Sequence, residues 1–378
     1  MHRTYLDHNA TTPVDPRVLD AMLPFLRADY GNPSSLHWFG QRARAAVEQA
    51  RAQVATLVGA DPAEIVFTAS GTESDNMALR GAAAKAPPPR TRVVCSAIEH
   101  HAVLNAARAM RDEGRPVAIA RVGEDGVLDL DDLAAKVDEA TAVVSVMLAN
   151  NETGVLQPVP EAARIARARG ALVHCDAVQA AAKVPIDVHG LGVDLLTLSA
   201  HKLYGPKGAG CLFVRRGTPM VPLVRGGAQE RNRRAGTENV AGIVGLGVAA
   251  ALAREALETE AGRVAALRDA LEARLLAIPG VRRNGGDPRV PNTTNVSFEG
   301  IDAEALLIAL DLEGIATSTG AACAAGGIEP SHVLRAMGQP PERVQSSLRL
   351  SLGRGTTQQD VDHAAEVIAA GVARMRKK

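Results

Sequence analysis

The chain has 378 residues and equal numbers of basic and acidic side chains, 42 Lys and Arg against 42 Asp and Glu. The zero formal charge predicts no global attraction to nucleic acid or to an anionic membrane, and an aromatic content of 2% leaves few stacking platforms for bases. A hydrophobic fraction of 46% suits a folded α/β protein, and the length favours two domains.

Short apolar strands alternate with helical segments through the middle of the chain. The expected strands are rich in Val, Ile and Leu, which is typical of strands covered on both faces. They cover residues 64–70, 92–98, 142–148, 171–177, 195–200 and 210–215. The expected helices cover residues 40–58, 72–84, 102–113, 131–137 and 160–170. This alternation predicts a mostly parallel sheet sandwiched by helices.

The pattern changes after Gly247, and the rest of the chain reads as a smaller α+β unit. The expected elements are a long helix at 249–278, a strand at 292–298, helices at 303–312 and 330–337, a strand at 347–352 and a last helix at 357–376. A Gly/Ala-rich loop covers residues 318–327, and the first dozen residues are expected to return to this unit. We therefore place the large domain at residues 13–255 and the small domain at residues 1–12 and 256–378.

The spacing of the cysteines and the length of the apolar runs indicate whether the chain has a metal site, contacts a membrane or is exported. Cys95, Cys175, Cys211 and Cys323 are far apart, which predicts neither a zinc site nor a disulfide framework. The first residues lack the pattern of a signal peptide, and the apolar run at residues 240–252 is interrupted by three glycines and is too short to span a bilayer. We expect a cytoplasmic protein with no metal site and no membrane contact.

Two polar motifs follow expected strands. Ser70 and Glu73 have the spacing of a helix-capping box, and a helix N-terminus there suits a phosphate, although an ordinary capped turn fits as well. Asp176 ends a strand, where ligand sites of open α/β sheets gather, and Gln179 follows it closely. A carboxylate there can pair with a ligand cation, and a solvated loop Asp is the alternative.

Lys202 supplies the third part of a possible cofactor site. It follows another expected strand and precedes a glycine-rich turn, where partial burial can lower the pKa of an amine and prepare it to form an imine. Asp176 precedes it by about one strand–helix–strand step. Pyridoxal 5′-phosphate (PLP) needs a Schiff-base lysine, a carboxylate at the pyridinium nitrogen and an anion cradle. All three occur in one expected sheet, so their conjunction predicts a PLP site.

Four further residues are candidates for chemistry. His100 follows a strand and could stack on a planar cofactor or transfer protons, while Asn151 could bind a ring or simply form a turn. Cys323 lies among small residues in a loop, which favours an exposed, used thiol, whereas the other three cysteines read as core residues. Arg349 lies inside an apolar strand and needs an anionic partner, either a substrate carboxylate or an internal Asp or Glu.

Taken together, these residues resemble the cysteine desulfurases of the NifS/IscS-like branch, in the class V aminotransferase family of fold-type I PLP enzymes. The similarity extends over nearly the whole chain. The matching segments are residues 5–12, 30–35, 67–76, 99–100, 150–152, 199–202, 234–237 and 329–332, with Asp176 and Cys323. The resemblance implies a seven-stranded-type sheet in the large domain and a small domain that carries the cysteine loop.

The resemblance also implies a role for each residue. The cofactor-binding set is Gly71, Thr72, His100, Asn151, Asp176, Gln179, Ser199, His201 and Lys202, completed by Thr237 from the other subunit of a homodimer. Lys202, His100 and Cys323 are implied to be catalytic, and Asn32 and Arg349 are implied to hold the carboxylate of the substrate, L-cysteine.

The implied activity converts L-cysteine to L-alanine and keeps the sulfur as a persulfide on Cys323. Glu329 and Pro330 follow the cysteine at the spacing of the branch with a long cysteine loop, which favours iron–sulfur cluster assembly. The implied partners are sulfur-acceptor proteins such as an iron–sulfur scaffold. The alternatives are a selenocysteine lyase or another PLP-dependent β-eliminating lyase, and a non-catalytic sulfur-carrier subunit.

Overall fold

The computed structural model describes residues 3–320, 323–324, 327–328 and 330–377, and for the described residues between 321 and 329 it describes the backbone alone. The central feature is a seven-stranded sheet with strand order β2-β8-β7-β6-β5-β3-β4. Its strands are β2 (Ile65–Thr68), β3 (Arg92–Ser96), β4 (Val117–Ala120), β5 (Thr141–Ser145), β6 (Leu172–Asp176), β7 (Leu195–Ser199) and β8 (Gly210–Val214). Neighbours from β4 through β7 pair in parallel, whereas β8 is antiparallel to both β7 and β2. The predicted mostly parallel sheet is confirmed.

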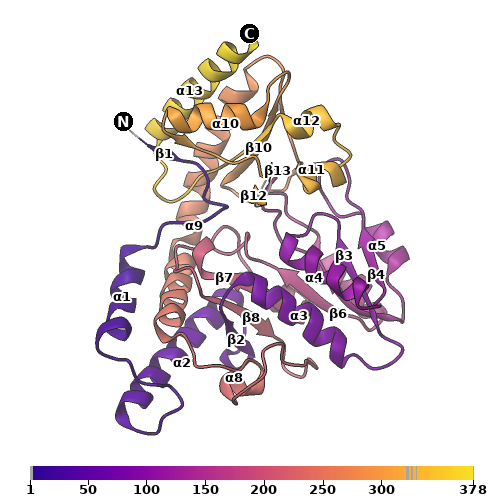
Figure 1. Cartoon of the computed structure of the whole chain (residues 1–378), viewed down its shortest axis with the longest axis vertical. Coiled ribbons are helices and arrows are strands. Elements are labelled where there is room, and N and C mark those ends of the chain that lie inside the picture. Colours follow the sequence, from indigo (N-terminus) through magenta and orange to yellow (C-terminus); the bar gives the residue numbers. More distant parts are fainter. Residues whose placement is uncertain (1–2, 321–322, 325–326, 329, 378) are drawn as a thin grey trace.

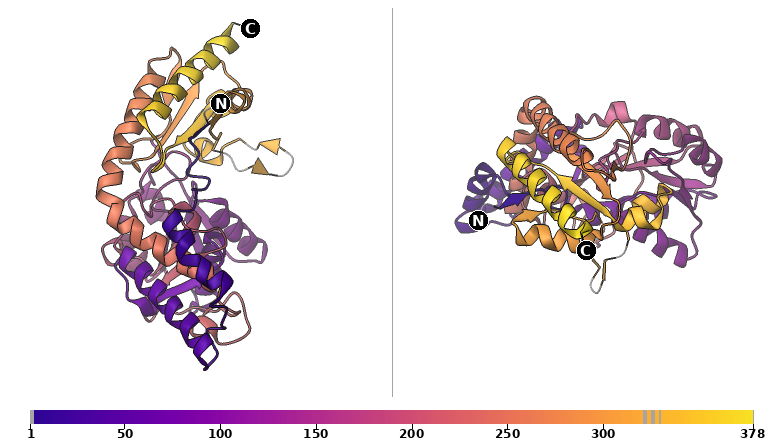
Figure 2. Two further views of the ribbon diagram at one scale, coloured as in Figure 1. Left: turned by 90° about the vertical axis from the view of Figure 1, so that its left-hand side faces the viewer. Right: turned by 90° about the horizontal axis from the view of Figure 1, so that it is seen from above.

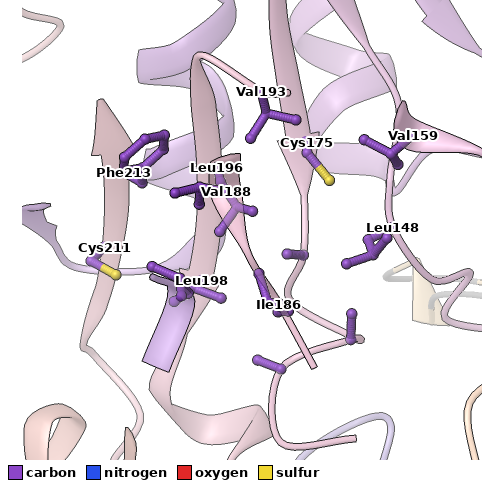
Figure 3. Packing of buried hydrophobic residues seen from close by; sticks show 14 of the residues in the cluster. Leu148, Val159, Cys175, Ile186, Val188, Val193, Leu196, Leu198, Cys211 and Phe213 are labelled. Carbon is purple, nitrogen blue, oxygen red and sulfur yellow. The ribbon is translucent and has the colours of Figure 1, made fainter. Parts of the chain in front are cut away.

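Helices cover both faces of this sheet. They are α1 (Pro16–Arg27), α2 (Trp38–Val58), α3 (Gly71–Lys85), α4 (His101–Asp112), α5 (Leu130–Lys136), α6 (Val159–Ala168), the short α7 (Val188–Leu191) and α8 (Gln229–Asn232), and α9 (Val240–Leu276). Side chains alternate along each strand, so Ile65 and Phe67 of β2 join the core under α2 and α9, while Val66 faces α3 and α4. Figure 3 shows Cys175 and Cys211 among aliphatic side chains of the first core, and Cys95 is buried in the second. These three cysteines are core residues, as predicted.

The helix α9 begins earlier than predicted and runs unbroken for 37 residues. The glycines that read as interruptions permit close packing instead. A Cβ atom on Gly245 would lie 2.7 Å from the Met22 sulfur, and one on Gly247 would lie 2.5 Å from the Ala50 Cα atom. By length and composition α9 could cross a membrane, so the prediction that this apolar stretch is too short to span a bilayer was wrong. Of its most apolar 18-residue window 56% is buried inside the protein, and α9 packs against α1 and α2.

A second group of elements lies at the opposite end of α9, near both labelled chain ends in Figure 1. It contains the strands β1 (Thr4–Tyr5), β9 (Val281–Arg283), β10 (Thr293–Phe298), β11 (Ile315–Ala316), β12 (Cys323–Ala324), β13 (Gly327–Ile328) and β14 (Ser347–Ser351). Its helices are α10 (Ala303–Leu312), α11 (His332–Ala336), α12 (Pro341–Gln345) and α13 (Gln358–Arg376). The strand β1 pairs with β11, so the N-terminal segment does return to this unit.

Each group of elements has its own buried cluster of apolar side chains. Along α9, the last buried residue of the cluster around the large sheet is Ala250, and the first buried residue of the smaller unit's cluster is Val264. The predicted domain boundary near residue 255 falls between these two positions and stays a prediction. Figure 2 shows α9 running along both units, which makes this helix their main covalent and packing connection.

Candidate active site

A cavity of about 250 Å³ opens at the carboxyl ends of β6 and β7, beside the start of α3. Parallel strands bring residues that are distant in the sequence to this one edge. The lining residues are Ser70, Gly71, Thr72, Asp75, His100, Met147, Asn151, Asp176, Val178, Gln179, Ser199, His201 and Lys202. Every residue predicted to bind the cofactor within one chain is therefore present at the cavity wall.

The start of α3 forms the anion-binding side of the cavity. The Ser70 hydroxyl caps the helix by accepting a hydrogen bond from the Glu73 N–H at 3.1 Å. The capping box is incomplete, because the Glu73 carboxylate accepts from the Ala69 N–H and from Arg234 instead. A Cβ atom on Gly71 would lie 3.0 Å from a Val178 methyl group, so glycine lets the start of α3 pack closely against the cavity wall. The positive end of this helix dipole suits an anion.

Asp176 ends β6 and is buried at the cavity wall. Its carboxylate accepts a hydrogen bond from the Val178 N–H at 2.9 Å. Burial raises its pKa to about 6, while the Val178 N–H and the Lys202 ammonium act in the opposite direction. A cationic ring nitrogen placed against this carboxylate would favour its ionised form.

Lys202 lies in the 3₁₀ turn η2 (Ala200–Lys202) that follows β7. Its ammonium donates hydrogen bonds to the main-chain oxygens of Asn9 and Ala10, each at 2.6 Å. Burial lowers the Lys202 pKa to about 8, and the Arg349 guanidinium lowers it further against the pull of two carboxylates. About a tenth of this amine is therefore neutral and nucleophilic at pH 7, far more than for an ordinary lysine.

His100 and Asn151 complete the polar wall. The Nδ1 atom of His100 accepts from the Ala102 N–H at 3.2 Å, which places the ring proton on Nε2. Burial lowers the His100 pKa to about 4, so the ring is neutral near pH 7. The Oδ1 atom of Asn151 is buried and lacks a hydrogen-bond partner within the described residues. Such an orphaned acceptor is expected where a ligand would supply the missing donor.

The residues present fit PLP. The cavity offers an amine, a carboxylate and a helix N-terminus around one space, with an imidazole and an unsatisfied amide on its wall. The sequence profile of the family described as "Aminotransferase class-V" matches residues 4–363.

The chain belongs to the class-V aminotransferase family.

Relatives and solved structures agree with this membership. The chain is 50% identical over 374 residues to a cysteine desulfurase of Nostoc sp., covering 98% of this chain and 93% of that one. It is 48% identical over 379 residues to the cysteine desulfurase NifS of Azotobacter vinelandii, covering 100% and 94%. A solved NifS-like protein superimposes with a TM-score of 0.93 at 39% identity, covering 99% of this chain and 100% of that one. The cysteine desulfurases of this family depend on PLP, which agrees with the cavity.

Arg349 has an internal anionic partner in this chain. Its Nη2 atom lies 2.6 Å from the Asp7 carboxylate, and Nη1 donates to the Asn151 main-chain oxygen at 3.0 Å. Of the two predicted partners for Arg349, the structure shows the internal Asp. This pairing does not prevent the guanidinium from also binding a substrate carboxylate. The Nε atom is buried and has no partner in the described part of the chain, so a donor is left for an incoming carboxylate.

Arg349 bonds to the cavity residue Asn151 but does not itself line the cavity. Three more predicted residues are not brought to the cavity by what the structure describes. Asn32 is exposed, and its side-chain oxygen accepts from the Ser34 N–H at 2.9 Å. Thr237 is also exposed, and its predicted target belongs to another subunit. Cys323 lies in β12, where its backbone pairs with Ile328, and its side chain is outside the described residues. The roles of these three residues stay predictions.

Four residues in or around the cavity were missed by sequence reasoning, and all but Lys183 are buried. Asn9 and Lys183 both hydrogen-bond to the cavity residue Gln179 without lining the cavity, and Asp75 lies on the cavity wall. Glu152 follows Asn151 and accepts a hydrogen bond from the Ser331 hydroxyl, just beyond the cysteine loop. The signal was available for three of them, because Asn9, Asp75 and Glu152 lie within segments that carry the family resemblance.

Proposed function

We propose that this chain is a PLP-dependent cysteine desulfurase that converts L-cysteine to L-alanine and receives the sulfur as a persulfide on Cys323. The observation that carries the proposal is the shared cavity of Lys202, Asp176 and the N-terminus of α3. It occurs in a chain that is 48–50% identical to cysteine desulfurases over nearly its full length.

The residues of the cavity have distinct proposed tasks. PLP, when bound, supplies an electron sink for the carbon atoms of the substrate. Lys202 holds the cofactor and, as a neutral amine, takes the α-proton of the substrate at Nζ. Asp176 would keep a proton on the ring nitrogen, and His100 would stack on the ring and serve in proton transfer. General acid–base steps of this kind typically contribute about 10²- to 10⁴-fold in rate.

The sulfur transfer balances without an external oxidant. The Cys323 thiolate attacks the γ-sulfur of the substrate, an S–S bond forms and the Cβ–S bond breaks. The electron pair of the broken bond stays with the carbon, which takes up a proton. The sum is L-cysteine plus enzyme thiol giving L-alanine plus enzyme persulfide. Arg349 binds the substrate carboxylate through Nε, which has no partner among the residues that the structure describes, and Asn32 is the second proposed carboxylate ligand.

The direct test is mass spectrometry of the protein after exposure to L-cysteine. We expect one added sulfur atom on the peptide that contains Cys323, and no addition when L-serine replaces L-cysteine. Cys323→Ala should keep the visible absorbance of bound PLP and lose sulfide release, whereas Lys202→Ala should lose that absorbance. Sulfide release by Cys323→Ala at the wild-type rate would instead favour a β-eliminating lyase. A purified protein that binds no PLP would favour a non-catalytic sulfur carrier.

The proposed enzyme is a cytoplasmic homodimer. An exposed apolar patch near the start of α2 supports a second copy as its occupant: Tyr30 is 76% exposed, Leu36 90% and Trp38 59%. In such a dimer Thr237 of one chain would reach the phosphate of the other chain's cofactor. Light scattering on the purified protein should give twice the monomer mass, and Leu36→Glu should lower the measured mass.

The proposed acceptor of the sulfur is an iron–sulfur scaffold or a related sulfur-binding protein.

A further inference from the structure

Lys183 is a half-buried lysine to which the proposed reaction gives no task. It lies in the turn region after β6, and its ammonium contacts two side-chain oxygens. Nζ donates to the Gln179 Oε1 atom at 2.7 Å and to the Asn9 Oδ1 atom at 2.9 Å. A lysine ammonium donates and cannot accept, so it fixes an oxygen, and not an NH₂ group, at each of these positions.

The other end of the Gln179 side chain is fixed independently. Its Nε2 atom donates to the Asn9 main-chain oxygen at 2.8 Å. A main-chain carbonyl can only accept, so the NH₂ group has to face it. Two one-way partners, an acceptor at Nε2 and a donor at Oε1, therefore leave Gln179 a single amide orientation.

This orientation decides what Gln179 presents to the cavity that it lines. The NH₂ group has two hydrogens, and the Asn9 carbonyl takes one of them. The second is left for a ligand atom that accepts. A flipped amide would turn a carbonyl oxygen toward the same atom, and a favourable hydrogen bond would become a repulsion between two acceptors.

We propose that Lys183 is a positioning residue that locks the Gln179 amide as a hydrogen-bond donor to the ring oxygen of PLP. This inference rests on the proposed cofactor and extends it to a residue that does not line the main cavity. Burial lowers the Lys183 pKa well below its usual value, with Lys202 and Arg349 adding to the effect. The ammonium form can only donate, whereas a neutral amine also has a lone pair, so the lock is strict while Lys183 is protonated and the Asn9 carbonyl alone favours the same orientation otherwise.

A double-mutant cycle with a spectroscopic readout tests the lock. The variants are Lys183→Met, Gln179→Leu and the double variant, with Lys85→Met as the control at an exposed lysine. For each apoprotein, PLP is titrated in and both the dissociation constant and the visible absorption maximum are measured. We expect Lys183→Met to weaken PLP binding about fivefold, the value of one net hydrogen bond of about 1 kcal/mol, and to move the absorption maximum.

The cycle separates positioning from general stability. In the Gln179→Leu background, Lys183→Met should change neither quantity further. Lys183→Arg keeps a donor and should restore the wild-type absorption maximum, which guards against a Met variant that folds poorly. Unchanged binding and absorbance in Lys183→Met, or effects that simply add in the double variant, would overturn the inference. Failure of the wild-type protein to bind PLP would instead remove the proposed function itself.

Discussion

The main-chain oxygen of Asn9 lies 2.6 Å from the Nζ atom of Lys202, although the two residues are 193 positions apart. The side chain of Asn9 also donates to the Asn151 main-chain oxygen at 3.1 Å and to the Thr293 hydroxyl at 2.9 Å. Thr293 belongs to β10 of the smaller unit. The N-terminal segment thus joins the amine of the cavity to both units of the chain.

The lowered pKa of Lys202 predicts unusual reactivity in the apoprotein. An ordinary lysine has a pKa of about 10.4, whereas burial lowers that of Lys202 to about 8. Only the neutral amine is nucleophilic, so labelling of Lys202 by an amine-reactive probe should rise with a midpoint near pH 8. Peptide mass spectrometry across pH 6 to 11 measures this midpoint.

Arg349→Gln supplies the control for that measurement. The guanidinium lowers the Lys202 pKa, so its removal should move the midpoint upward. A midpoint near 10.4 in the wild-type apoprotein would show that Lys202 is not held in a desolvating site.

Arg349→Lys should separate substrate binding from cofactor binding. The guanidinium serves Asp7, the Asn151 carbonyl and, through Nε, a proposed substrate carboxylate, and a single ammonium cannot reproduce that planar geometry. We expect KM for L-cysteine to rise about 10- to 10²-fold, since 1.4 kcal/mol is tenfold and a charge-assisted bond contributes about 1.5–3 kcal/mol. The visible spectrum of bound PLP should not change. A normal KM would assign Arg349 to Asp7 alone.

Continuous Val, Ile and Leu runs identified six strands of the large sheet, because buried parallel strands are apolar on both faces. The seventh strand, β4, was missed since it is a short edge strand whose Ile119 is 40% exposed. The start of α9 was missed for another reason. Glycine lowers helix propensity, yet Gly245 and Gly247 are needed where α9 packs closely against neighbouring residues.

The cavity could be predicted because its residues follow strands that end at one sheet edge. The bonds made by Asn9 and Lys183 could not, because they depend on how the N-terminal segment folds across the sheet. The partner of Arg349 was equally out of reach. Any of the acidic residues could have paired with it, and only the fold selects Asp7.

A buried ion pair closes the open edge of the large sheet. Arg51 bonds to Glu230 through two contacts of 2.8 Å, and the two side chains also satisfy the Ile65 carbonyl and the Phe67 N–H of edge strand β2, each at 2.8 Å. Glu230→Gln should lower the free energy of unfolding by about 3–5 kcal/mol, because a buried charge loses its partner.

A double-mutant cycle completes this test. It adds the single variant Arg51→Met and the double variant that combines Arg51→Met with Glu230→Gln. The double variant should lose less than the sum of the single losses, since neither charge is then left unpaired. Urea unfolding measures each value. The exposed pair Arg80 and Glu113 is the control, and breaking it should change stability little. Additive losses would mean that the two buried residues act separately.

Glu152 gives the chain a pH-dependent stability. Burial raises its pKa to about 7, against an ordinary value of about 4.3, so between these pH values the folded state holds a proton that the unfolded state has released. Because the folded state binds more protons, stability falls as pH rises through this window, by up to about 1.4 kcal/mol per pH unit. Glu152→Gln cannot release a proton and should unfold with a flatter pH dependence between pH 5 and 7. Urea midpoints of the apoprotein at those two pH values measure the difference, with the exposed Glu258→Gln as control. If the urea midpoint changes with pH equally in Glu152→Gln and wild type, the proton that the folded state retains belongs to another group.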